Sequence, residues 1–269
     1  MAAVAADWKR SSDGTAEVVV DASGRDEWGR PVDYRALNGA IREAMCSGAE
    51  RITVRGVMGQ RYIASACTER GLSIRIHGTP GNNLGAFLDG PTIEVLGNAQ
   101  DMTGNTMSSG RIVVHGNAWD VTGLAARGGR ILVKGSSGYR VGIHMKEFGE
   151  AVPTILIGGR AGDYLGEYMA GGAILVLGQG IDGSPVGSSV GAGMHGGCIY
   201  VLGPVEEHQL GTGAAIQPLT DDDRARLEEM VSDFEQTFRT EVSHDWSRYT
   251  KVGPRSSRPF RGHFDPTPV

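Results

Sequence analysis

The stretch Gly97–Gly116, GNAQDMTGNTMSSGRIVVHG, contains the pattern that decides the fold. It fits Gly-Asn-Ala-x-Asp-x-x-Gly-x-x-Met-x-x-Gly-x-Ile-x-Val-x-Gly, and looser copies return at Gly78–Gly97, Gly116–Gly135 and Gly159–Gly178. Each of these copies advances the chain by 19 residues. A fixed period of this kind indicates a repeat architecture, in which each copy is one structural unit stacked on its neighbour.

Short predicted strands follow the same rhythm. Each contains two apolar residues two positions apart, which places both side chains on one face of a strand. The pairs are Ile52/Val54, Ile74/Ile76, Ile93/Val95, Ile112/Val114, Ile131/Val133, Ile155/Ile157, Ile174/Val176 and Ile199/Val201. Successive pairs are 22, 19, 19, 19, 24, 19 and 25 residues apart, so the longer steps indicate insertions in loops.

The length of the repeat selects the architecture. Helical-hairpin repeats need about 33 residues or more, and the leucine-rich-repeat signature is absent. A repeat of 19 residues suits one coil of a parallel β-helix, in which each coil pairs with the next at a spacing of about 4.8 Å. We therefore predict an all-β solenoid, a right-handed parallel β-helix of about eight coils, with helical flanks at both ends.

Glycine supplies 42 of the 269 residues and recurs at fixed places in the repeat. At the coil corners we expect either a positive φ or a close approach of two backbones. The predicted turn glycines are Gly78, Gly97, Gly116, Gly135, Gly159, Gly178 and Gly203.

Three aspartates, Asp101, Asp120 and Asp163, occupy one phase of the repeat, three residues before a glycine. A short carboxylate at such a place accepts backbone N–H bonds, so we predict turn capping. Stacked carboxylates could instead bind Ca²⁺ or act as an acid and base, and both alternatives stay open at this point.

Composition excludes several classes of protein. The formal net charge is −5, so the chain carries no basic excess for nucleic acid. No apolar run approaches the roughly 18 residues of a membrane span, and the N-terminus lacks the features of a secretory signal. The three cysteines, Cys46, Cys67 and Cys198, are far apart and give no metal-ligand spacing. We expect a cytoplasmic protein with no metal, no cofactor of its own, and no nucleic-acid or membrane partner.

The flanks differ from the repeat and divide the chain into three predicted parts. Residues 1–50 contain a short strand at Val18–Val20 and an amphipathic helix from Asp33 to Cys46, and they form an end cap. Residues 51–203 form the glycine-repeat β-helix. Residues 204–269 contain a helix over 221–241 and a tail rich in proline and arginine, which we predict to dock on a partner.

Insertions between Glu147 and Pro153 and between Gln179 and Gly187, together with everything after Gly203, break the rhythm of the repeat. A solenoid core needs none of them, so we expect partner contacts there. Aromatic and arginine side chains dominate interface hot spots. The predicted partner-facing residues are His144, Lys146, Glu147, Phe148, Trp246, Tyr249, Arg255, Arg258 and Phe260. Deletion of residues 243–269 is expected to leave the β-helix folded while weakening association with a partner.

Five segments carry a resemblance to a known family: GTPGNNLGAFL, GNAQDMTGNTM, GYRVGIHMKE, GGRAGDYLGEYMAGG and VGAGMHGGCIYVLG. They resemble the glycine-repeat (GXGXG) β-helix domain of glutamate synthase, most closely the form that occurs as a separate subunit of split glutamate-synthase-like complexes. The resemblance spans roughly residues 50–203.

This resemblance implies a complex with two partners. A glutamine amidotransferase-like subunit releases ammonia, and an FMN-binding subunit, with or without an iron–sulfur cluster, reduces the imine formed with 2-oxoglutarate. The β-helix subunit braces the two and carries no catalytic residue. The amine substrate, ammonia from glutamine or methylamine, stays open, as does the electron donor.

Two other interpretations remain. The fold is similar to the β-helical scaffold subunit of formylmethanofuran dehydrogenase and of the related formyltransferase/hydrolase complex, which implies a scaffold role there. A free-standing carbohydrate-active β-helix would need a secretion signal and rows of exposed aromatic residues, neither of which the sequence indicates. The segment Gly191–Gly196 matches the dinucleotide fingerprint G-x-G-x-x-G, but a strand follows it where a helix is required, so a coil corner is favoured.

Overall fold

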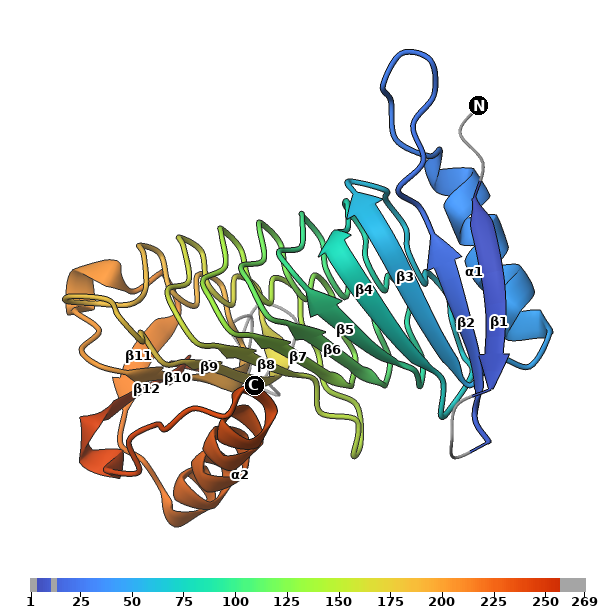
Figure 1. Ribbon diagram of the computed structural model, residues 1–269. Coiled ribbons are helices and arrows are strands. Elements are labelled where there is room, and N and C mark those ends of the chain that lie inside the picture. The colour runs from blue at the N-terminus through green and yellow to red at the C-terminus, as the bar shows by residue number, and fades with distance from the viewer. Residues whose placement is uncertain (1–3, 11–13, 257–269) are drawn as a thin grey trace, which may run out of the picture.

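The Ile/Val pairs predicted from the sequence stack in one column of parallel strands (Figure 1). The computed structural model describes residues 4–10 and 14–256. Ile52 pairs with Ile74, Ile74 pairs with Ile93, and the same register continues to Ile199. The strands are β3 (Arg51–Met58), β4 (Ser73–Thr79), β5 (Thr92–Leu96), β6 (Arg111–Val114), β7 (Arg130–Val133), β8 (Thr154–Ile157), β9 (Ala170–Val176) and β10 (Gly196–Leu202). The predicted β-solenoid is confirmed, with about seven turns between β3 and β10.

The N-terminal flank closes one end of the solenoid. Strand β2 (Ala16–Asp21) pairs in parallel with β3, and β1 (Ala5–Arg10), which the sequence did not indicate, pairs antiparallel with β2. Helix α1 (Tyr34–Cys46) lies over the open end of the first coil, with Leu37 and Ile41 buried (Figure 1). Asp33 begins the helix because its carboxylate accepts the backbone N–H of Arg35.

The C-terminal flank extends the same sheet. Strand β12 (Tyr249–Pro254) pairs antiparallel with β10, and β11 (Ala214–Gln217) pairs antiparallel with β12. Two short 3₁₀ turns, Glu207–Gln209 and Trp246–Arg248, connect these elements. In the described part of the chain, a single sheet of twelve strands therefore runs from β1 to β11. It continues across residues 50 and 203, which we predicted as domain boundaries.

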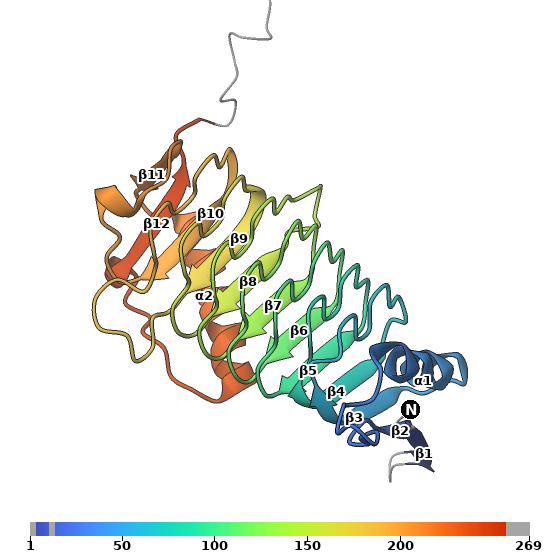
Figure 2. The ribbon, with the colours of Figure 1, turned by 90° about the horizontal axis from the view of Figure 1, so that it is seen from above.

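Helix α2 (Asp221–Phe238) covers half of the outer face of this sheet (Figures 1 and 2). The outward-facing residue at the centre of each strand changes along the solenoid. It is Thr53, Arg75 and Glu94 in β3–β5, then Val113, Leu132, Leu156, Leu175 and Tyr200 in β6–β10. The apolar half packs against Leu227, Met230, Val231, Phe234 and Phe238 of α2 and forms a core separate from the one inside the coils. Neither helix of the described chain has the length and apolar character that crossing a membrane requires.

Glycines permit the coils to stack for two different reasons. At Gly97, one of the predicted turn glycines, φ is not positive, and a Cβ would overlap the carbonyl oxygen of Gly78 in the preceding coil. At Gly104, in the segment on another side of the coil, φ is +71° and a Cβ would overlap Cδ1 of Ile131 inside the core. The second kind recurs in neighbouring coils at Gly85, Gly123, Gly142 and Gly166, and these positions were not among the predicted turn glycines.

Substitution can separate the two effects at Gly104, which are the strain of a positive φ and the overlap of a Cβ with Ile131. Gly180 has nearly the same φ, +73°, but open space around it. Gly104→Ala should therefore lower the free energy of unfolding by about 1–3 kcal/mol more than Gly180→Ala, which suffers only the left-handed strain. Denaturant unfolding of both variants measures the difference. Equal losses would show that overlap with Ile131 does not constrain the fold.

Candidate functional site

Each coil contains a five-residue segment in which every second residue has a positive φ. In one coil these residues are Arg140, Gly142 and His144, with φ of 56°, 70° and 56°. The N–H groups of Arg140 and His144 donate forward to the next coil, while that of Gly142 donates back to the carbonyl of Thr122 at 2.8 Å. The segments therefore form a second hydrogen-bonded side of the solenoid.

We call this side the left-handed face and define it by the first and fifth residue of each segment. The first residues are Tyr62, Asn83, Met102, Val121, Arg140, Tyr164 and Ser189, and the fifth are Ala66, Phe87, Thr106, Ala125, His144, Tyr168 and Gly193. Four of them, Tyr62, Phe87, Tyr164 and Tyr168, are aromatic residues at least 38% exposed.

Aromatic and cationic groups on this face are ordered by stacking. The ring of His144 stacks on that of Tyr168, with centroids 5.3 Å apart and planes 10° from parallel. The guanidinium of Arg140 lies 5.0 Å from the ring centroid of Tyr164 and donates from Nε to Glu167 Oε2 at 2.9 Å. The side chains are therefore held in fixed positions although they are exposed.

The predicted partner-facing residues near the first insertion begin on this face, at His144, and continue into the loop that follows it. His144, Lys146, Glu147 and Phe148 are all exposed, and Phe148 is 83% exposed. Phe148 and Ala151 exchange two backbone hydrogen bonds of 3.1 Å, and Glu147 Oε2 accepts the N–H of Gly172 at 2.8 Å. The loop before β8 therefore projects from the coils (Figure 1) with its backbone tied down, and it presents Phe148 to solvent.

The C-terminal residues that we predicted to face a partner differ from this loop, because those in the described part of the chain mostly contact the chain itself. Tyr249 is 6% exposed and its hydroxyl donates to the carbonyl of Ser243, so it faces the chain's own core and offers no anchor to a partner. Trp246 is half-buried against the same core. Arg255 is exposed, but its Nε donates to the carbonyl of Ala214. Arg258 and Phe260 lie outside the described residues.

The expected effect of the C-terminal deletion is corrected for the same reason. Removal of residues 243–269 would remove β12, which is paired with β10 on one side and β11 on the other. Tyr249 and Val252, both buried, would leave with it. This deletion therefore disrupts the C-terminal end of the sheet, and it cannot test a partner contact alone.

The aspartates of the repeat, Asp101, Asp120 and Asp163, form hydrogen bonds between neighbouring coils. Asp120 Oδ1 accepts the N–H of Tyr139 and Asp163 Oδ1 accepts that of Ser188, both at 2.8 Å. The corresponding bond to Asp101 comes from the N–H of Asp120 and is 3.2 Å long. Each bond joins one coil to the next, whereas the sequence prediction placed it within a turn. Within residues 4–10 and 14–256 no three His, Cys, Asp or Glu side chains are grouped so that they could hold a metal ion.

A buried polar cluster, which the sequence did not indicate, joins α2 to the sheet. Asp223 is 6% exposed and accepts hydrogen bonds from the Tyr200 hydroxyl at 2.6 Å and from Lys251 Nζ at 2.7 Å. Burial alone raises the pKa of Asp223, but the bonds from Lys251, Tyr200 and Thr220 outweigh it and hold this pKa well below its usual value. Burial also raises the pKa of Tyr200, and the nearby Cys198 and Asp223 add to the effect.

The other half of α2 is fixed by ion pairs. Arg111 Nη2 lies 2.6 Å from Asp233 Oδ1, and Arg130 Nη1 lies 2.9 Å from Asp233 Oδ2. Arg130 also pairs with Glu229. Hydrogen bonds from both arginines hold the pKa of Asp233 below its usual value despite its partial burial. The carboxylates with shifted pKa values, Asp223 and Asp233, are thus paired within the chain. Their partners attach α2 to β6, β7, β10 and β12.

Comparison with known proteins defines the family. The family model described as the GXGXG motif matches residues 47–252. The chain belongs to the GXGXG-motif family. It is 48% identical over 263 residues to an uncharacterized protein of Methanocaldococcus jannaschii, a match that covers 94% of this chain and 98% of that protein. It is 37% identical over 145 residues to ferredoxin-dependent glutamate synthase 2 of Synechocystis sp., a match that covers 51% of this chain and 9% of that enzyme.

This relation is with one small part of the synthase, and the chain is thereby a GXGXG domain related to glutamate synthase. The five segments that carried the resemblance lie within the matched range. The match continues beyond them to residue 252 and so includes most of β12, which belongs to the same sheet as the coils.

The buried cluster makes a prediction about stability and pH. Asp223→Asn should lower the free energy of unfolding by about 3 kcal/mol at neutral pH, because it leaves Lys251 without its carboxylate partner. The folded-state pKa of Asp223 is depressed, so the ionised carboxylate stabilises the fold above about pH 5, and this contribution is lost as pH falls below about 4.

The measurement is thermal or urea unfolding between pH 3 and 7, with Asp222→Asn as the control. Asp222 is the preceding, exposed residue of the same helix turn. The difference in the free energy of unfolding between the Asp223 variant and the unsubstituted chain should become smaller as the pH falls. A difference that is constant with pH would show that the ionised form is not what stabilises the cluster.

Proposed function

We propose that this chain is a non-catalytic structural subunit of a glutamate-synthase-like oxidoreductase complex. In this proposal it holds an FMN-binding synthase subunit against a glutamine amidotransferase-like subunit. The complex forms glutamate or an N-substituted glutamate from 2-oxoglutarate, with ammonia or methylamine as the amine. FMN, with or without an iron–sulfur cluster, belongs to the partners.

One observation carries this proposal: the same module matches proteins of very different size. Over 145 residues the chain is similar to 9% of a ferredoxin-dependent glutamate synthase, and over 263 residues it is similar to 98% of the M. jannaschii protein. A module that is covalently joined to catalytic domains in one protein and separate in another is expected to meet its former neighbours through surface contacts.

The physical properties of the solenoid suit a brace. Seven steps at the β-strand spacing give a stack about 34 Å long. Backbone bonds between coils, the ion pairs beneath α2 and the Asp223 cluster all act within the chain and stiffen it. A stiff element can keep two partners at a fixed separation, which transfer of a small reactive molecule between two sites requires.

We place the contact with a partner at the projecting loop and the adjacent left-handed face. Phe148 offers an exposed aromatic anchor on a turn with a hydrogen-bonded backbone. His144, which stacks on Tyr168, and the exposed Lys146 precede it by four and two residues and add aromatic and cationic groups. Pre-ordered side chains lose less conformational entropy when a partner binds.

The proposal predicts the behaviour of a reconstituted complex. The chain, mixed with FMN-binding and amidotransferase-like subunits from the same organism, should co-elute with both in size-exclusion chromatography. Phe148→Ser should weaken binding to the partner about 30-fold or more, as the loss of a central hot spot does. Trp28→Ser removes another exposed aromatic residue, 74% exposed, and should leave binding unchanged.

Thermal unfolding of both variants is the control for folding. Loss of affinity in the Phe148 variant with an unchanged melting temperature supports the assigned contact. Full co-elution of the Phe148 variant would show that the partner binds elsewhere on the chain. Failure of the unsubstituted chain to bind either subunit would contradict the proposed function itself.

A further inference from the structure

The first coil of the solenoid has no coil before it, and α1 lies in that place. In every later coil the central segment pairs backwards. For example, the N–H of Gly85 donates to the carbonyl of Ile63 at 2.9 Å, and the carbonyl of Ala86 accepts the N–H of Ala66 at 2.8 Å. The first coil presents the same kinds of backbone groups towards α1, so these groups need other partners.

Two of the backward-facing groups of the first coil are satisfied by side chains. The carbonyl of Arg61 accepts from Asn38 Nδ2 of α1 at 2.9 Å. The N–H of Thr68 donates to Glu69 Oε2 at 3.0 Å. These two side chains replace the bonds that a preceding coil would make.

Two further groups in the same segment have no hydrogen-bond partner among the described residues. They are the N–H of Ala64 and the carbonyl of Ser65, which correspond to the paired groups of Gly85 and Ala86 in the next coil. Ala64 is 6% exposed. An unpaired buried N–H is rare because its desolvation is not compensated.

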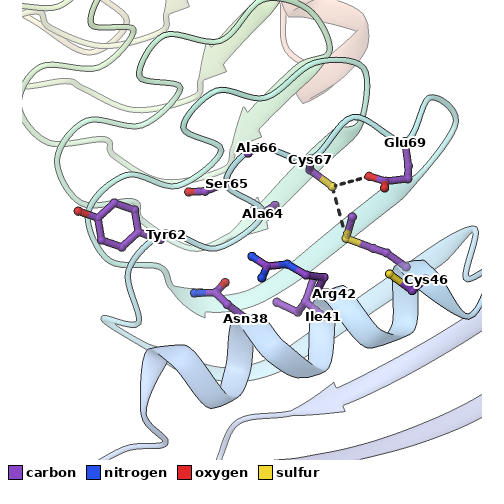
Figure 3. Close-up of a pocket in the computed structure, with 11 residues that line it drawn as sticks. Asn38, Ile41, Arg42, Cys46, Tyr62, Ala64, Ser65, Ala66, Cys67 and Glu69 are labelled. Atoms are coloured by element: carbon purple, nitrogen blue, oxygen red, sulfur yellow. Dashed lines mark hydrogen bonds between the residues drawn. The ribbon is translucent and has the colours of Figure 1, made fainter.

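These groups line a cavity of about 350 Å³ between α1 and the first coil (Figure 3). Asn38 Oδ1 is buried and also lacks a partner. Figure 3 shows the Arg42 side chain extending from α1 into the space towards Ala64 and Ser65. Within the described chain the guanidinium of Arg42 has no recorded ion pair or hydrogen bond, and its charge acts on the neighbouring Cys67. The remaining lining includes Met45, Cys46 and Cys67, and one carboxylate, that of Glu69, which accepts hydrogen bonds from the Cys67 thiol and the N–H of Thr68.

The buried thiol of this cavity, Cys67, is held in its protonated form. Burial and the neighbouring Glu69 raise the pKa of Cys67 to about 12, so the group stays protonated. It donates to Glu69 Oε2 at 3.3 Å and lies 3.4 Å from the Met45 sulfur. Cys67 therefore contributes a neutral thiol, and not a thiolate, to the cavity.

We infer that this cavity binds a small molecule that carries a primary carboxamide and a carboxylate. The unpaired groups are one donor, the N–H of Ala64, and two acceptors, the carbonyl of Ser65 and Asn38 Oδ1. A primary carboxamide presents the complement, one acceptor oxygen and two N–H donors. Arg42 supplies the cation for the carboxylate. The site is independent of the partner contact and of the proposed function.

Calorimetry with matched probes on the full chain tests the inference. The probes are 4-carbamoylbutanoate, which has both groups, glutarate, in which a carboxylate replaces the amide, and pentanamide, which lacks the carboxylate. The first should bind about tenfold more tightly than either of the others, as expected for hydrogen bonds to buried and charged groups.

Variants on α1 assign the roles of the residues. Arg42→Ala should reduce the affinity for 4-carbamoylbutanoate to that for pentanamide, without affecting pentanamide itself. Arg35→Ala is the control, since it removes the same charge from an exposed residue of α1 outside the cavity lining. Asn38→Leu should weaken both amides, and its melting temperature must be measured because Asn38 also caps Arg61.

Three outcomes would overturn the inference. No saturable heat with 4-carbamoylbutanoate up to about 20 mM would mean that only water fills the cavity. Equal binding of glutarate would show that the unpaired backbone groups do not select an amide. Equal losses of affinity for 4-carbamoylbutanoate in the Arg42 and Arg35 variants would show that Arg42 does not contact the carboxylate and that only the net charge of α1 matters.

Discussion

Backbone pairing between successive coils is the constraint on which the rest of the structure depends. Coils can pair on the sheet side and on the left-handed face at once only if their backbones stay about 4.8 Å apart. Side chains at Gly97 or Gly104 would prevent this approach, either against a neighbouring carbonyl or against Ile131 in the core. The abundance of glycine is therefore a consequence of close stacking and not of flexibility.

A solenoid with two paired sides has a problem at each end, and this chain solves the two ends differently. At the C-terminal end, residues 206–213 supply bonds to the last coil, for example from the N–H of Val190 to the carbonyl of Gln209, and β12 and β11 continue the sheet. At the N-terminal end, α1 covers the first coil but satisfies only part of its polar backbone. The cavity beneath α1 is a direct result of placing a helix where a coil would pair.

The two outer surfaces also differ in kind. The apolar half of the sheet is covered by α2, whose position is fixed by Asp233 and Asp223 at its two halves. On the left-handed face and in the loop of Phe148, aromatic side chains such as Tyr168 and Phe148 stay exposed, and His144 stacks on Tyr168. A brace needs both properties, internal rigidity and an ordered free surface, and the fold supplies them on separate sides.

The sequence by itself determined the coil repeat, the Ile/Val columns and both helices, because these depend on periods of 2, 3.6 and 19 residues that local composition displays. The family came from the resemblance of five glycine-rich segments and not from any period. The outward-facing residues at the strand centres change from polar to apolar between Glu94 and Val113. This change in the sequence could have predicted where α2 covers the sheet. Only the tertiary structure decided that Tyr249 is buried and that Arg111 meets Asp233, 122 residues away. Contacts at such a separation leave no periodic trace, and a missing partner, such as that of the Ala64 N–H, exists only once the neighbouring elements are in place.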